Sequence, residues 1–172
     1  NETVEAWKIA LQHGDSPVGL MLTRQNLPTI DRGRYAPASG VARGGYVLAD
    51  AAGEAAPELI LIASGSEVAL ALEAHERLVA EGVRSRVVNL ASWQLFGRQD
   101  AAYRESVLPT ACRRRLAVEA GVTFGWERWV GDEGEVIGLD RFGASAPAGT
   151  LFEEFGFTAD NVYARAKAVL NR

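Results

Sequence analysis

Arg24 is the residue whose position best suits chemistry with an anion. It directly follows an apolar run, residues 17–23, which we expect to form a strand buried on both faces, and it precedes a segment rich in Pro, Gly, Ser and Asn. A guanidinium on such a rigid base could reach into a crevice and bind a phosphate through paired, charge-assisted hydrogen bonds. The alternative is an exposed or ion-paired linker arginine, and spacing alone leaves the two open.

The segment ASGSEV, residues 63–68, is a second candidate anion site, because a strand is expected to pass into a helix there. Ser64 and Glu67, however, have the spacing of a capping box, in which each side chain satisfies a backbone amide at the helix start. The segment also lacks the lysine of a phosphate-binding loop. We therefore favour a structural cap.

The other reactive side chains form no recognisable catalytic pattern. His13 ends a predicted helix, where its charge would favour the dipole, and His75 lies on the apolar face of another. Cys112 is the single cysteine, which excludes an internal disulfide and favours a small buried side chain. The basic run at residues 113–115 is interpreted as a solvated helix end. The acidic residues that could supply paired carboxylates, all expected on the surface, are Asp132, Glu133, Glu135, Glu153 and Glu154.

Composition excludes several classes of protein. The 172 residues are 48% hydrophobic, which suits one globular domain with a modest extra arm, and the net charge of -4 argues against a nucleic-acid partner. No apolar stretch reaches the 18 residues that a membrane span requires. We expect a soluble, cytoplasmic protein.

Two units are expected along the chain. Residues 1–14 are typical of a helix, because Val4, Trp7 and Leu11 recur at helical spacing and Gly14 follows. No initiator methionine precedes Asn1, so we expect the natural protein to extend upstream. Residues 25–45 are aperiodic and typical of a linker, which places a domain boundary near residue 42.

Beyond the linker, strand-like and helix-like segments alternate. The expected strands are residues 45–48, 58–64, 85–92, 115–120 and 135–139. The expected helices begin after Ser64 and at residues 99, 123, 148 and 159, with Thr158 capping the last. The first helix should bury Val68, Ala71, Leu72, His75, Leu78 and Val79. This order predicts an α/β fold: a three-layer α/β/α domain with a mostly parallel sheet of five strands, preceded by a helix and strand of a neighbouring domain.

Seven segments of the sequence, in the same order from end to end, resemble transketolases. They are TRQNLP (residues 23–28), ARGGYVL (42–48), ASGSEV (63–68), QDAAYRESVLP (99–109), VEAG (118–121), FGASAP (142–147) and LFEEFGFT (151–158). Each segment alone is a weak signal, but their order and spacing together are specific to the family.

The resemblance implies a carboxy-terminal piece of a transketolase. Residues 1–41 would be the tail of the pyrimidine-binding domain plus a linker, and residues 42–172 the complete C-terminal domain. The family transfers a two-carbon ketol unit between sugar phosphates in the pentose phosphate pathway, with thiamine diphosphate and a divalent cation, Mg or Ca, as cofactors. A homodimeric parent enzyme is implied, and no cofactor or metal is expected on this chain itself.

The same resemblance implies that Arg24 binds the substrate phosphate, although Thr23 stands before it where serine is common in the family. The catalytic histidines, the glutamate that activates the cofactor and the GDG cation motif have no counterpart here, and His13 matches none of them. No catalytic residue is therefore assigned, and we expect the isolated chain to be inactive.

Two alternatives stay open. The chain could act as a folded dimerisation or regulatory module. The aromatic residues Trp126, Trp129 and Phe142 favour this hypothesis. It could also come from another thiamine-dependent enzyme, such as dihydroxyacetone synthase or deoxyxylulose-phosphate synthase. In each case, residues 1 to about 40 should be less ordered than the rest, because buried surface is what offsets chain entropy.

Overall fold

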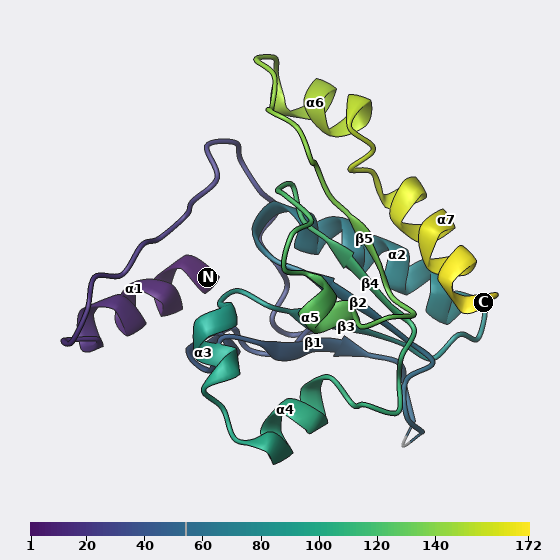
Figure 1. Ribbon diagram of the computed structural model, residues 1–172, viewed down its shortest axis with the longest axis horizontal. Helices are drawn as coiled ribbons and strands as arrows, with labels where there is room; N and C mark the ends of the chain where they lie inside the picture. Colours follow the sequence, from purple (N-terminus) through teal and green to yellow (C-terminus); the bar gives the residue numbers. More distant parts are fainter. Residues whose placement is uncertain (54) are drawn as a thin grey trace.

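The structure is a computed structural model that describes residues 1–53 and 55–172, and its centre is a five-stranded sheet (Figure 1). The strands are β1 (Tyr46–Asp50), β2 (Leu59–Ala63), β3 (Ser85–Asn89), β4 (Arg115–Val118) and β5 (Glu135–Ile137). Their order is β1-β3-β2-β4-β5. The pairs β2–β3, β2–β4 and β4–β5 are parallel, whereas β1 runs antiparallel to β3. The predicted α/β class and the mostly parallel sheet are confirmed.

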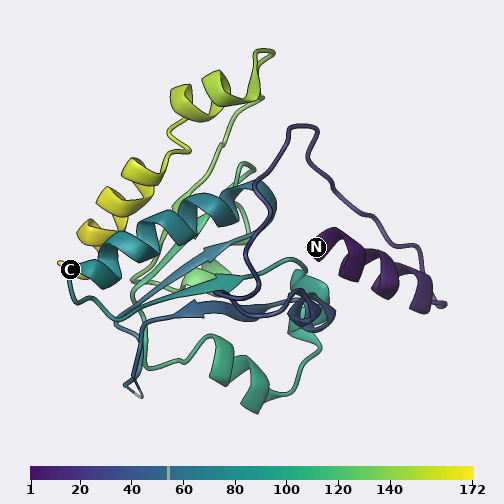
Figure 2. The same ribbon diagram turned by 180° about the vertical axis from the view of Figure 1, so that it is seen from behind.

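Helices cover both faces of the sheet, which gives the three expected layers (Figures 1 and 2). One face packs against α2 (Val68–Ala80) and α7 (Ala159–Leu170). The other packs against α3 (Trp93–Gly97), α4 (Ala101–Val107) and α5 (Glu127–Val130). The remaining helix of the domain, α6 (Ala148–Glu154), precedes α7.

Strand β2 occupies the middle of the sheet because its run of branched apolar residues has no polar face. All five residues are buried. Leu59, Leu61 and Ala63 belong to the core beneath α2 and α7, while Ile60 and Ile62 belong to the core beneath α3, α4 and α5. This division follows from the alternation of side chains along a strand. Both cores therefore depend on one short strand.

Several helix predictions need correction. Helix α3 is absent from the predicted elements, and Ser92 begins it by accepting a hydrogen bond from the Leu95 amide. The strand predicted over residues 85–92 therefore ends earlier, at Asn89. Helix α5 covers only the end of the segment predicted from residue 123. In α2 the predicted stripe is buried except for Val79, which is 37% exposed. Thr158 caps α7 as predicted.

The basic run at residues 113–115 is not a solvated helix end. Arg115 begins β4, and its guanidinium donates hydrogen bonds to the carbonyl oxygens of Cys112, Trp129, Leu108 and Pro109, at 2.7–3.2 Å. The side chain is partly buried, because these carbonyls replace the water it would otherwise bind. Arg115 thus ties the loop between α4 and β4 to helix α5 at the start of the sheet.

The aromatic residues thought to mark an interface divide into two groups. Trp126 and Trp129 are buried and pack edge-on against Trp93, with ring centroids 5.0 and 6.0 Å away. Phe142, in contrast, is 95% exposed on the loop that follows β5. The tryptophans are therefore core residues, and of these three described residues Phe142 alone is exposed to a partner.

Other parts of the chain contact both edge strands of the sheet. At the outer edge of β1, the linker amide of Ala36 donates to the carbonyl oxygen of Leu48 at 3.0 Å. At β5, the Glu135 carboxylate binds Arg165 and also Arg172, the latter at 2.6 Å. Glu135 is thus an ion-paired residue at the sheet edge rather than the free surface carboxylate expected.

The N-terminal residues form an arm outside the sheet domain. Helix α1 (Glu2–Gln12) confirms the predicted helix, and a short 3-10 helix, η1 (Ala38–Arg43), leads into β1. The strand predicted over residues 17–23 is absent: the segment is extended but pairs with no strand among the described residues. Met21 is 92% exposed. An apolar run forms a buried strand only where a neighbouring sheet supplies hydrogen bonds and cover.

Candidate functional site

Arg24 lies at a bend in the extended segment that leads from α1 back toward the sheet domain, and not at the end of a strand. Its side chain is exposed, and the structure gives it no hydrogen bond or ion pair with any of residues 1–53 and 55–172. The guanidinium therefore keeps all of its donors for an external anion. The rigid strand that the sequence suggested as its base is missing.

The base of the arm is held instead by a network around Glu2, the first residue of α1. One carboxylate oxygen, Oε1, accepts hydrogen bonds from Arg32 in the linker at 2.8 Å, from the Tyr46 hydroxyl at 2.5 Å and from Asn89 at 2.7 Å. Tyr46 and Asn89 belong to β1 and β3. Burial raises the pKa of the Tyr46 hydroxyl, and its hydrogen bond to Glu2 raises the pKa further. Sequence reasoning missed this network because its members are scattered over almost ninety residues.

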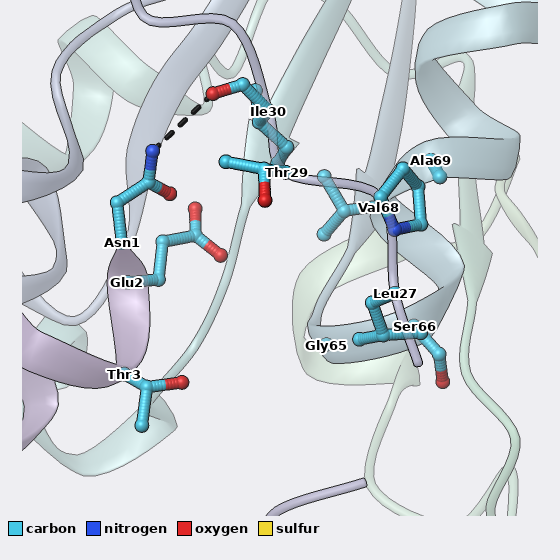
Figure 3. Close-up of a pocket in the computed structure, with 11 residues that line it drawn as sticks. Asn1, Glu2, Thr3, Leu27, Thr29, Ile30, Gly65, Ser66, Val68 and Ala69 are labelled. Atoms are coloured by element: carbon cyan, nitrogen blue, oxygen red, sulfur yellow. Dashed lines mark hydrogen bonds between the residues drawn. The ribbon is translucent and has the colours of Figure 1, made fainter. Parts of the chain in front are cut away.

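A cavity of about 170 Å³ lies beside this network, between the arm and the start of α2 (Figure 3). In the close-up, Asn1, Glu2 and Thr3 line one side and Gly65, Ser66, Val68 and Ala69 the other, with Thr29 and Ile30 between them. The Asn1 side chain donates to the carbonyl oxygen of Ile30 at 3.2 Å. The start of α1 and the linker are thus joined directly at the base of the arm.

The predicted capping box at residues 64–67 does not form. Ser64 makes no side-chain cap; its hydroxyl donates to Glu119 at 2.8 Å, at the end of the neighbouring strand β4. Glu67 accepts a hydrogen bond from the amide of Ala120 at 3.2 Å and another from the hydroxyl of Ser66. The residue types suit a cap, but their partners come from another loop.

Glu67 and Glu119 consequently lie at the carboxyl ends of the adjacent strands β2 and β4. Burial raises the pKa of Glu67, against the effect of its hydrogen bonds from Ser66 and Ala120. Burial also raises the pKa of Glu119, and the nearby charge of Glu67 raises it further, whereas the Ser64 hydroxyl lowers it. These carboxyls bind protons more readily than exposed ones.

His75 and Cys112 have the structural roles expected. His75 is buried, its Nδ1 lies 2.8 Å from the Ser85 hydroxyl, and burial lowers the pKa of its ring. His13 lies beside Ser16 at the end of α1, 2.8 Å from its hydroxyl. Cys112 is buried, which raises the pKa of its thiol and disfavours the reactive thiolate.

In the part of the chain that the structure describes, no group of three or more His, Cys, Asp or Glu side chains is placed to hold a metal ion. Residues 1–53 and 55–172 also include no helix long and apolar enough to cross a bilayer. Many carboxylates are already used in ion pairs; Asp132 and Glu133, for example, both bind Arg113. These donors do not fit a divalent cation.

Comparison with known proteins identifies the domain. Residues 44–158 match the family model of the transketolase-like C-terminal domain. The chain is 54% identical over 169 residues to transketolase 1 of Escherichia coli, and 51% identical over 170 residues to the transketolase of Halalkalibacterium halodurans. These matches cover 98% and 99% of this chain but 25% of each relative.

Solved structures agree. The transketolase of Leishmania mexicana superimposes with a TM-score of 0.88 at 37% identity, over 99% of this chain and 24% of the solved one. A transketolase of Pichia stipitis in complex with sedoheptulose 7-phosphate gives 0.86 at 36% identity, over 99% of this chain and 24% of that one. The chain belongs to the transketolase family. It spans about a quarter of the length of the members it matches.

Proposed function

We propose that this chain is the C-terminal quarter of a transketolase that transfers a two-carbon ketol unit between sugar phosphates. The observation that carries the proposal is the extent of the similarity. The matches to both relatives include the arm as well as the sheet domain and cover at least 98% of this chain. The Pichia stipitis relative was solved with a sugar phosphate bound. Dihydroxyacetone synthase and deoxyxylulose-phosphate synthase become less favoured parents, because the relatives compared are transketolases.

In this proposal residues 1–41 are the end of the pyrimidine-binding domain plus a linker, and residues 42–172 are the C-terminal domain. The match to the family model begins nearby, at residue 44. The position of η1, which leads directly into β1, is consistent with such a boundary. The whole enzyme would be a cytoplasmic homodimer in the pentose phosphate pathway.

Arg24 is proposed to bind the phosphate of the sugar substrate. Its exposed guanidinium is not engaged by other described residues, and a planar fork of donors matches a phosphate dianion. The group binds and orients the substrate; it moves no proton, because arginine stays charged at any pH the protein experiences. The reacting carbons are then held by groups elsewhere in the parent enzyme.

Thiamine diphosphate and a divalent cation would be bound by the remainder of the parent enzyme. The carboxylates described above are ion-paired or hydrogen-bonded within this chain and do not fit the cation. When bound, the thiamine cofactor supplies the carbanion stabilisation that ketol transfer requires. No step of the reaction is assigned to residues 1–172 beyond phosphate binding.

The test compares the isolated chain with the full-length protein that contains it. Both are supplied with thiamine diphosphate and Mg, with xylulose 5-phosphate as donor and ribose 5-phosphate as acceptor. The full-length protein should transfer the ketol unit and the isolated chain should not. Turnover by the pure chain, or none by the full-length protein, would contradict the proposal.

A role for the C-terminal domain in dimer packing is favoured by Phe142 and by Phe124, which are 95% and 84% exposed on loops after β5 and β4. Exposed aromatic side chains are typical of interface anchors. Phe142→Ser in the full-length protein should weaken the dimer in sedimentation equilibrium. An unchanged dimer dissociation constant would count against this role.

A further inference from the structure

The arm that carries Arg24 is closed at its base. Asn1 binds the backbone of Ile30, and Arg32 donates both to Asn1 at 3.3 Å and to Glu2 at 2.8 Å. Arg32 is itself fixed by a 2.6 Å hydrogen bond to the carbonyl oxygen of Ala36. Residues 3–29, which include most of α1, therefore form a closed segment. Its two ends are hydrogen-bonded to each other and to the sheet domain.

Glu2 is the residue on which this closure depends. Its Oε1 accepts from three donors that belong to the linker, to β1 and to β3. Its side chain is 23% exposed and that of Arg32 16%, so the ion pair is partly shielded from water and stronger than a surface pair. Removing the charge would leave Arg32 and two hydroxyl or amide donors competing for a weaker acceptor.

Arg24 is close to this base along the chain. Leu27, three residues later, already lines the cavity beside Asn1 and Glu2. Three extended residues span at most about 10 Å, so the Arg24 backbone lies within that distance of the cavity wall. Among the described residues no other side chain holds Arg24, so within this chain the Glu2 network is the anchor that sets where the arm meets the sheet domain.

We propose that Glu2 is a positioning residue for the substrate phosphate: by fixing the base of the arm on β1 and β3, it places Arg24 for two-point phosphate binding. This inference rests on the proposed role of Arg24. A displacement of about 1 Å at a binding group is enough to lose much of its contribution. The effect of Glu2 should therefore appear only with substrates that carry a phosphate.

The experiment uses the full-length protein with Glu2→Gln, which keeps the shape of the side chain and removes its charge. Steady-state kinetics are measured with xylulose 5-phosphate and with erythrulose, a ketose without phosphate. We expect KM for xylulose 5-phosphate to rise about tenfold, as for a weakened charged hydrogen bond, with kcat unchanged and with erythrulose kinetics unchanged. The matched control is Glu5→Gln on the same helix, whose carboxylate binds Lys8, three residues away, and no other residue that the structure describes.

A double-variant cycle with Arg24→Ala separates this inference from the proposed function. If Glu2 acts through Arg24, Glu2→Gln should add nothing to the KM of the Arg24→Ala variant. An additive effect, or equal losses with both donors, would overturn the positioning role. If Arg24→Ala leaves KM for xylulose 5-phosphate unchanged, the proposed phosphate-binding role of Arg24 itself fails.

Tyr46→Phe provides a second test of the positioning role of Glu2 if Glu2→Gln does not fold. It removes one donor from Glu2 and keeps the apolar ring in the core. KM for xylulose 5-phosphate should rise about threefold, with erythrulose again unaffected, because one of three donors is lost. No change in KM would contradict the inference.

Discussion

The arm and the sheet domain use similar residue types to different ends. In β2 every apolar side chain is buried between two layers of helices, whereas Met21 and Leu22, in an equally apolar run, lie largely exposed. The two segments have a similar apolar composition, but only β2 has layers of helices that cover its side chains. An apolar run thus predicts burial only together with the elements that cover it.

Hydrogen exchange should show the largest difference between the two regions. Amides of β2 should open only on global unfolding, whereas those of residues 17–24 lack strand partners. We expect exchange to be about a thousandfold faster in the arm or more, since local openings range from near zero to the global free energy. Equal protection in the two regions would show that the arm is held by contacts absent from this structure.

Truncating core and arm side chains should also separate the regions. Leu61→Ala removes a fully buried side chain from β2 and should lower the free energy of unfolding by about 2–5 kcal/mol. Met21→Ala, its control in the arm, should change it by less than about 0.5 kcal/mol. Urea denaturation measures both. A large loss for Met21→Ala would mean that the arm folds together with the domain.

Polar anchoring can be tested at Arg115. Arg115→Gln should cost about 1–3 kcal/mol of unfolding free energy, because carbonyl oxygens in the loop between α4 and β4 and in helix α5 lose their donor. The matched control is Arg114→Gln, an exposed neighbour, which should be close to neutral in thermal unfolding. Equal effects at the two positions would show that Arg115 contributes only charge.

The smallest effect is expected from pH. The pKa values of Glu67 and Glu119 are raised in the folded chain, so folding binds protons and these carboxyls make stability fall as pH rises above about 4.5. Each carboxyl contributes at most about 1.4 kcal/mol per pH unit over that window. Replacing both with Gln should flatten the pH profile of unfolding relative to Glu153→Gln. A steeper profile would refute the assignment.

Local patterns were sufficient for much of the sheet domain. The buried strand β2, the apolar stripe of α2 and the Thr158 cap could be predicted because each depends on residues within a single helix or strand. The spacing of Ser64 and Glu67 misled for the opposite reason. Their partners are Glu119 and Ala120, which are more than fifty residues away.

The candidate site was predictable only in part. Arg24 could be singled out, but the support expected for it, a buried strand, is absent, and the base observed instead depends on Glu2, Arg32 and Asn89. No periodicity connects such distant positions. A resemblance can point to a functional residue, whereas the groups that place it become visible only in three dimensions.

The contacts made at the two edge strands bear on how the protein behaves at high concentration. An open edge offers unpaired amides and carbonyls to strands of other molecules, which is a common start of aggregation. Here the linker amide of Ala36 occupies the Leu48 carbonyl on one side, and Arg165 and Arg172 surround Glu135 on the other. A shortened chain that begins at β1 would free the Leu48 carbonyl for a strand of another molecule, and its solubility should fall accordingly.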